Sequence, residues 1–143
     1  MEDRHRAALA AALAGLALGG CGGGDGKKVS DPDAVRAAVS SFAKAFGAGN
    51  GKAACDLMTA QARAAFVKRV QSLIATTDCA RAIATVHDEA GAQVNLAFSD
   101  ATVSNVMVTG SSATATLTAS GHSATARLSR EGGSWKLTGV PGI

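Results

Sequence analysis

Hydrophobic positions between residues 31 and 90 recur every three to four residues, which is the spacing of one face of an α-helix. The clearest case runs from Asp31 to Phe46, because Ser30 or Asp31 can cap its start and Pro32 fits a first helical turn. The sequence GAGNG then ends this helix. Its predicted buried face holds Val35, Ala38, Val39, Phe42, Ala45 and Phe46.

Further helices are expected before residue 90. A short one carries Cys55, and Thr59 and Asp78 are residue types that cap helix N-termini, so we expect a helix to follow each of them. The predicted inward positions of these helices are Leu57, Met58, Ala62, Phe66, Val70, Leu73, Ile74, Cys79, Ala82, Ile83 and Val86. We interpret His87, Asp88 and Glu89 as a solvated helix end.

From about Ala101 the hydrophobic pattern alternates, as in β-strands. The segments ATVSNVMVT, ATATLTAS, SATARLSR and SWKLTGV are separated by turn sequences, and the last three put their apolar residues mainly on one face. They predict a four-stranded antiparallel meander with one sheet face exposed to solvent and the other face covered by the helices. The predicted class is therefore α+β. The preceding segment QVNLAF also alternates, and its interpretation as strand or loop stays open.

The N-terminal pattern differs from the rest of the chain. Arg4 and Arg6 precede an apolar run from Ala7 to Leu18, which is only about 12 residues long and so has the length of a secretory signal core rather than of a spanning helix. Leu18-Gly19-Gly20-Cys21 resembles a bacterial lipobox. The resemblance implies cleavage before Cys21 and diacylation of its sulfur; an ordinary signal with a chance cysteine is the alternative.

These features divide the chain into three parts. Residues 1–20 are expected to be a lipoprotein signal peptide, residues 21–30 the lipidated cysteine and a flexible glycine-rich tether, and residues 31–143 one folded domain. Two or more acyl chains give stable anchoring. The expected location is the extracytoplasmic face of the cell membrane, with membrane lipid as a partner through Cys21. The formal net charge of +3 also suits an anionic surface, with an ordinary solvated face as the alternative.

Two cysteines remain if Cys21 carries lipid. Cys55 and Cys79 are 24 positions apart, and an even number in an oxidising compartment favours a disulfide. The bridge would stabilise a core that has only one Trp, four Phe and no Tyr. Two buried free thiols and a metal pair are alternatives. No metal site is expected, because neither cysteine has a second Cys or a His two to five positions away.

Helices followed by a meander that ends in REGGSWKLTGV resemble the nuclear transport factor 2-like (SnoaL-like) superfamily, and more closely its small lipid-anchored members. The matching segments are AVRAAVSSFAKAFGAGNGKAACDLMT, the Cys79 helix, DATVSNVMVTGSSATATLT and the Gly-Gly-x-Trp-Lys strand. The resemblance implies a curved antiparallel sheet wrapped on helices in a cystatin-like cone, which often holds a small apolar ligand. It also implies that two copies can pair through the sheet as a homodimer.

Chemistry-bearing residues are sparse. Enzymes of this superfamily place an acid, often with Tyr or His partners, inside the cone, whereas the inward strand positions here are Ala, Leu, Val and Trp. No catalytic residue and no cofactor are therefore expected. Nucleic acid is disfavoured as a partner, because the basic residues lack interleaved aromatics. The pattern favours an anchored module that binds a small apolar ligand or an envelope protein.

Candidate residues for lining a ligand pocket are Phe42, Leu117, Leu128 and Trp135, for which ordinary core packing is the alternative role. Two other functions stay open. One is an isomerase- or hydrolase-type enzyme of the same fold that uses Asp100 or His122, and the other is a purely structural envelope domain.

Overall fold

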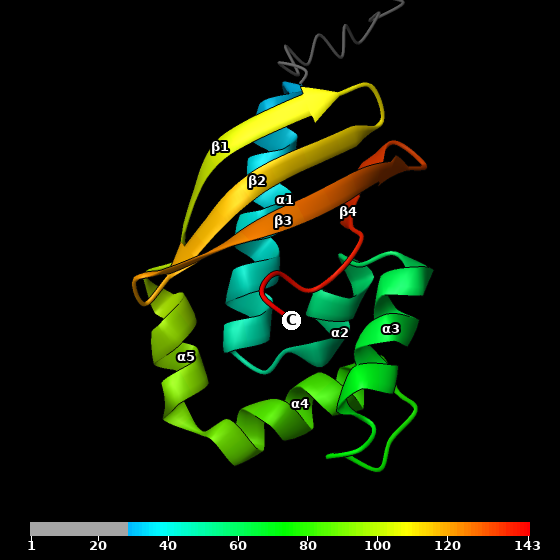
Figure 1. The fold of residues 1–143 in the computed structure, drawn as a ribbon, viewed down its shortest axis with the longest axis vertical. Coiled ribbons are helices and arrows are strands. Elements are labelled where there is room, and N and C mark those ends of the chain that lie inside the picture. The colour runs from blue at the N-terminus through cyan, green and yellow to red at the C-terminus, as the bar shows by residue number, and fades with distance from the viewer. Residues whose placement is uncertain (1–28) are drawn as a thin grey trace, which may run out of the picture.

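The structure is a computed structural model that describes residues 29–143, so the predicted signal segment, Cys21 and most of the tether lie outside the described residues. Helices come first and a four-stranded antiparallel sheet follows, which confirms the predicted α+β class (Figure 1). Between residues 29 and 143, no helix is both long and apolar enough to cross a membrane. The elements are α1 (Asp31–Gly47), α2 (Gly51–Asp56), α3 (Ala60–Val70), α4 (Cys79–Ala90), α5 (Ala92–Ser99), β1 (Thr102–Thr109), β2 (Ser112–Ala119), β3 (His122–Glu131) and β4 (Ser134–Leu137).

Polar side chains at the predicted positions cap three of the helices. Ser30 accepts a hydrogen bond from the Asp33 amide at the start of α1, and Thr59 accepts one from the Ala62 amide at the start of α3. Asp78 caps α4 by accepting from the Arg81 amide. Each cap satisfies one of the backbone donors that a helix leaves free at its N-terminus.

Two parts of the helical prediction are corrected by the structure. α3 ends at Val70, so Leu73 lies in the following turn and is 82% exposed, not inward as predicted, whereas Ile74 is buried. QVNLAF is neither strand nor loop, because it forms α5. Helical spacing there brings Val94 and Phe98 onto the core while Leu96 stays exposed.

His87 also differs from its prediction as part of a solvated helix end. Asp88 and Glu89 are exposed, but the His87 side chain is only 28% exposed. Its ring lies against Gly49, where a Cβ atom would come within 2.6 Å of it, and its Nδ1 lies 3.6 Å from the Asp88 carboxylate.

The sheet has the strand order β1-β2-β3-β4, with every neighbouring pair antiparallel. Its helix-facing side carries the apolar residues that alternation predicted, and the opposite side carries mainly Thr, Ser and Arg127. A bulge interrupts β1 between Ser104 and Met107. Asn105 adopts a positive φ of 48° in the bulge, and its side-chain amide donates to the Thr116 hydroxyl.

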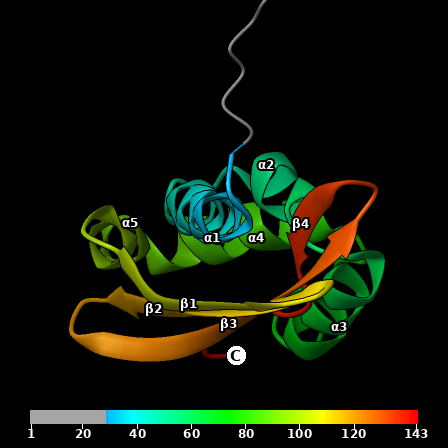
Figure 2. The same ribbon diagram turned by 90° about the horizontal axis from the view of Figure 1, so that it is seen from above.

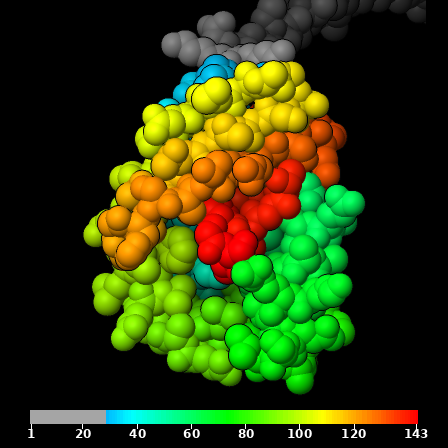
Figure 3. All heavy atoms as spheres, viewed as in Figure 1, coloured from blue at the N-terminus to red at the C-terminus, as the bar shows by residue number. Residues whose placement is uncertain are grey.

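The helices α1, α2, α4 and α5 lie on one side of the curved sheet, and α3 lies beside it (Figure 2). α1 contacts β1, β2 and β4, so it is the central element of the core. In the space-filling view the C-terminal residues, in red, lie between β3 and α3 (Figure 3). The largest fully buried side chains are Phe42, Met58, Ile83, Leu137, Val35 and Val39.

One edge of the sheet is closed by the segment between α2 and α3. The Leu137 amide of β4 donates to the Leu57 carbonyl at 2.8 Å, and the Thr59 amide donates to the Leu137 carbonyl at 2.9 Å. This short parallel bridge uses backbone groups that an edge strand would otherwise leave unpaired. It also fixes α2 and α3 relative to the sheet.

Candidate binding groove beside the disulfide

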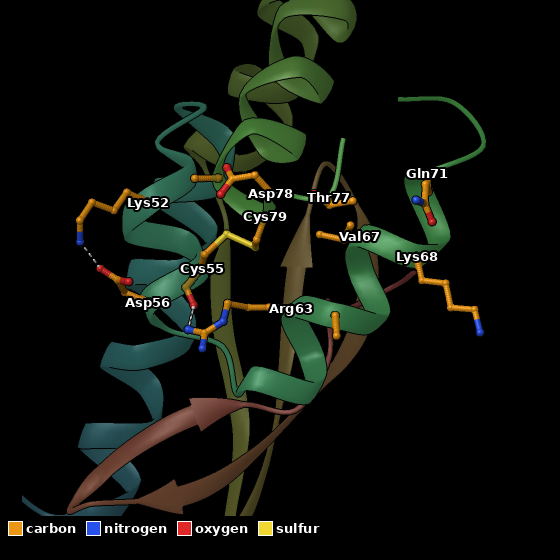
Figure 4. Close-up of a pocket in the computed structure, with 12 residues that line it drawn as sticks. Lys52, Cys55, Asp56, Arg63, Val67, Lys68, Gln71, Thr77, Asp78 and Cys79 are labelled. Atoms are coloured by element: carbon orange, nitrogen blue, oxygen red, sulfur yellow. Dashed lines mark hydrogen bonds and ion pairs between the residues drawn. A yellow bond between two sulfur atoms is a disulfide. The ribbon is translucent and has the colours of Figure 1, made fainter. Parts of the chain in front are cut away.

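A groove of about 720 Å³ opens between α2, α3 and the start of α4 (Figure 4). Its walls combine small apolar side chains with charged residues and with both cysteines. The lining residues are Lys52, Cys55, Asp56, Arg63, Ala64, Val67, Lys68, Gln71, Thr77, Asp78, Cys79 and Ala80.

The predicted disulfide between Cys55 and Cys79 is present and joins α2 to α4, with a Cα–Cα distance of 6.2 Å. Gly51 lets the two helices come this close. A Cβ atom at Gly51 would lie 2.0 Å from the carbonyl oxygen of Ala80, which is too short for any side chain. A glycine and a covalent bridge therefore set the spacing of two sides of the groove.

Cations from distant parts of the chain meet at the C-terminal end of α2. Arg63 of α3 donates from Nη1 to the Cys55 carbonyl at 3.2 Å, and Lys136 of β4 donates from Nζ to the Asp56 carbonyl. The last carbonyls of a helix have no partner within the helix and carry its partial negative charge, so both contacts are favourable. Figure 4 shows Arg63 pointing across the groove toward Cys55.

The Asp56 carboxylate is held in its charged form by these neighbours. Lys52 donates a hydrogen bond to it at 2.7 Å and holds the pKa of Asp56 below its usual value, and the charges of Lys136 and Arg63 act in the same direction. Three cations thus surround one carboxylate. The end of α2 consequently carries an excess of positive charge.

Asp56 and Asp78, the carboxylates that line the groove, already have partners. Asp56 pairs with Lys52, and Asp78 accepts from the Arg81 amide at 2.7 Å as the cap of α4. Both cysteines are consumed in the disulfide. No group of three or more His, Cys, Asp or Glu side chains in residues 29–143 is arranged to hold a metal ion. The arrangement is suited to holding an anionic group beside an apolar one.

The four predicted ligand-lining residues lie elsewhere. Phe42, Leu117, Leu128 and Trp135 belong to the core cluster and are at most 5% exposed. Other residues line the groove and the neighbouring surface cavities. The indole N–H of Trp135 is buried without a hydrogen-bond partner, and the Arg130 guanidinium lies 4.8 Å from the centre of the Trp135 ring.

Asp100 and His122, the residues of the alternative enzyme hypothesis, are both exposed at the ends of elements. Asp100 is the C-cap of α5, and His122 is the first residue of β3. They lie outside the groove, so the structure does not bring them together with the charged residues there.

Comparisons of the chain with protein-family models, with curated proteins and with solved structures find no match.

Proposed function

We propose that this protein is a membrane-anchored lipoprotein of the extracytoplasmic face that binds a ligand without transforming it. The observation that carries the proposal is the Cys55–Cys79 disulfide. A disulfide within the domain favours an oxidising compartment and leaves Cys21 as the third cysteine, directly after Leu18-Gly19-Gly20. That position suits acylation at the start of the mature chain.

We also propose that the domain has the nuclear transport factor 2-like cone. Support comes from the order of helices before meander, from the curvature of the sheet in Figure 2 and from the position of α1 against the sheet face. The space between the helices and the curved sheet is filled by core side chains such as Phe42 and Leu128. The ligand therefore binds in the groove beside the disulfide.

The chemistry of the groove favours a ligand with an apolar body and an acidic group. Ala64, Val67 and the disulfide offer apolar surface, while Arg63 and Lys68 bring positive charge. A carboxylate or phosphate placed between these cations is attracted to both of them, and the attraction weakens as salt screens the exposed charges.

Anchoring is tested by expressing the full chain in a bacterial host and separating membranes from soluble material. We expect the wild type in the membrane fraction, with the intact mass of residues 21–143 plus its acyl groups. Cys21→Ala should leave the membrane fraction or retain residues 1–20. An unacylated wild type that fractionates like Cys21→Ala would show that the anchoring proposal is wrong.

Ligand binding is tested by native mass spectrometry of the protein purified from membranes. We expect an additional mass that is lost on denaturation and that is absent from Ala64→Trp, because the new ring fills the groove. Ala60→Trp is the matched control: Ala60 is an exposed residue of the same helix that does not line the groove. An additional mass retained by Ala64→Trp, or absent from the wild type, contradicts binding in the groove.

A further inference from the structure

The outer side of α3, the turn after it and the neighbouring Ile143 combine exposed apolar residues with positive charge. Leu73 is 82% exposed and Ile143 is 53% exposed, and both are among the few large hydrophobic side chains that the described residues leave in solvent. Lys68 and Arg69 are exposed in the last turn of α3. We call these four residues the α3 surface.

A shallow apolar cavity of about 450 Å³ belongs to this surface. It lies between α3 and the C-terminal segment, and Phe66 and Val140 contribute to its walls. Lys68, Arg69 and Ile143 also line it. Lys68, Arg69 and Ile143 therefore border a continuous apolar area. Leu73 does not line the cavity and adds a separate exposed apolar side chain four positions after Arg69.

Charge is distributed unevenly over the domain. The stretch from Ala60 to Thr77 has no acidic residue and contains Arg63, Lys68 and Arg69. Between Arg81 and Arg127 there is no lysine or arginine, and the acids Asp88, Glu89 and Asp100 are all exposed at the end of α4 and around α5. α3 and α5 lie on opposite sides of the molecule in Figures 1 and 2. α3 and the turn after it are thus basic, while the end of α4 and α5 are acidic.

We propose that the α3 surface lies on an anionic phospholipid membrane, with Leu73 inserted at the level of the acyl boundary and Lys68 and Arg69 at the phosphates. Exposed apolar residues flanked by cations fit a surface that is apolar inside and anionic at its headgroups. The inference rests on the proposed lipid anchor, because the anchor makes a weak contact effectively intramolecular.

The length of the chain before α1 permits this orientation. Nine residues lead from Cys21 to Ser30, and a segment of this length spans at most about 32 Å. α1 itself is 17 residues long, which corresponds to about 25 Å. The start of α1 can therefore stand well above the membrane while the side of the domain that carries α3 rests on it.

The test uses the lipidated full chain in vesicles, with tryptophan reporters. Leu73→Trp places an indole on the α3 surface, and Leu96→Trp is the matched control, because Leu96 is a leucine of α5 that is 68% exposed. The native Trp135 is 5% exposed and provides a constant background. The vesicles contain phosphatidylglycerol with phosphatidylcholine, or phosphatidylcholine alone, each with a brominated lipid that quenches inserted indoles.

In anionic vesicles we expect at least about twofold stronger quenching of the Leu73→Trp reporter than of the Leu96→Trp reporter. This difference in quenching should shrink in neutral vesicles. It should also shrink in about 0.5 M salt, where the Debye length is only a few ångström, and when both reporter variants also carry Lys68→Gln and Arg69→Gln. Lys44→Gln, on α1, should not change it.

The intact mass of the same samples separates this inference from the proposed function. An acylated protein whose two reporters are quenched equally overturns the inference and leaves the anchor intact. Equal quenching of the Leu73→Trp reporter in neutral and anionic vesicles overturns the role of anionic lipid. A reporter shielded from an aqueous quencher but not reached by brominated lipid would identify a second copy of this chain on this surface and would overturn the membrane contact. Absence of acyl mass overturns the anchor itself and, with it, this inference.

Discussion

Gly51 is the residue at which α2 and α4 come closest. We predict that Gly51→Ala destabilises the domain by about 1–3 kcal/mol, because the methyl group would overlap the backbone carbonyl of Ala80 and force the helices apart. The measurement is urea denaturation followed by circular dichroism. The midpoint should fall, while the slope of the transition stays the same.

Gly139→Ala is the control for this substitution. Gly139 has no atom within 4 Å of an added Cβ and does not have a positive φ, so Ala there should be neutral or stabilise by a few tenths of a kcal/mol. If both variants had the same midpoint, the close approach of α2 and α4 would be disproved.

Asp56 provides a second prediction for a single residue. Its pKa is lowered first by the hydrogen bond from Lys52 and then by the Lys52 charge. Lys52→Gln should therefore raise the pKa of Asp56 toward the ordinary value of an aspartate, as measured by NMR titration of the carboxyl carbon. Lys44→Gln removes a lysine that does not act on Asp56 and should leave the titration curve unchanged. If Lys52→Gln left the titration curve of Asp56 unchanged, the ion pair between Lys52 and Asp56 would be contradicted.

The sign of the pH effect follows from the direction of the shift. Because the folded state lowers the pKa of Asp56, the pair stabilises the fold above the unfolded pKa, and this stabilisation is lost as the pH falls through the folded pKa. Asp56 is an exposed side chain, so the effect should also weaken in salt.

At the scale of elements, the disulfide joins α2 to α4 across a sequence separation of 24 residues. Replacing Cys55 and Cys79 together by alanine should lower the free energy of unfolding by about 3.5 kcal/mol, since a loop of that size gains entropy in the unfolded chain. Urea denaturation of oxidised protein and of the double variant measures the difference.

Reduction of the wild type separates the bridge from the side chains. If the bridge stabilises through the unfolded state, reduced wild type should unfold at nearly the midpoint of the double variant. A double variant as stable as oxidised wild type would mean that contacts such as that between Gly51 and Ala80 already hold α2 and α4 together.

Most helices and all strands could be predicted because local signals and burial agree there. Ser30, Thr59 and Asp78 are capping residues that do cap, and the alternation in β2 and β3 matches one buried sheet face. The candidate disulfide followed from the parity of cysteines. In each case the information lies within a few residues or in a simple count.

The segment that forms α5 was less predictable because local and tertiary signals conflict. Val94, Leu96 and Phe98 alternate as in a strand, but the Phe98 ring packs on Phe46, with ring centres 5.5 Å apart, and its Cβ lies where a side chain at Gly47 would be. Packing on α1 therefore decides the conformation. No alternation pattern contains that contact.

The groove was not predictable for a related reason. Its positive end is assembled from Lys52, Arg63 and Lys136, which come from three different elements. Lys136 is 80 residues away in the sequence from the carbonyl that it contacts. The i,i+4 spacing of Lys52 and Asp56 is visible in the local sequence, but nothing there shows that Arg63 and Lys136 join them. The clearest sequence signal in the groove is its pair of cysteines, and the chemistry around them depends on how α2, α3 and β4 pack.

At the scale of the whole molecule, stability should fall from α1 toward α5. α1 buries six of its residues and contacts most other elements, whereas α5 buries none and has no side-chain cap. We predict that amides of residues 92–99 exchange at least roughly 100-fold faster with deuterium than those of residues 35–46, because α5 can open locally while α1 opens only with the whole domain. Hydrogen-exchange mass spectrometry measures both segments.

Denaturant dependence decides whether α5 opens on its own. Exchange in α1 should accelerate steeply with low concentrations of urea, since global unfolding exposes much surface, while exchange in α5 should hardly respond. Phe98→Ala should speed exchange in α5 alone, because it removes the ring that holds α5 on Phe46. Equal rates and equal urea dependence in both segments would mean that the domain opens as one unit. A separate opening of α5 would instead place the least stable part of the domain on its acidic side, opposite the basic α3 surface. Because the groove and the disulfide lie among α2, α3 and the start of α4, local motion of α5 would leave them undisturbed.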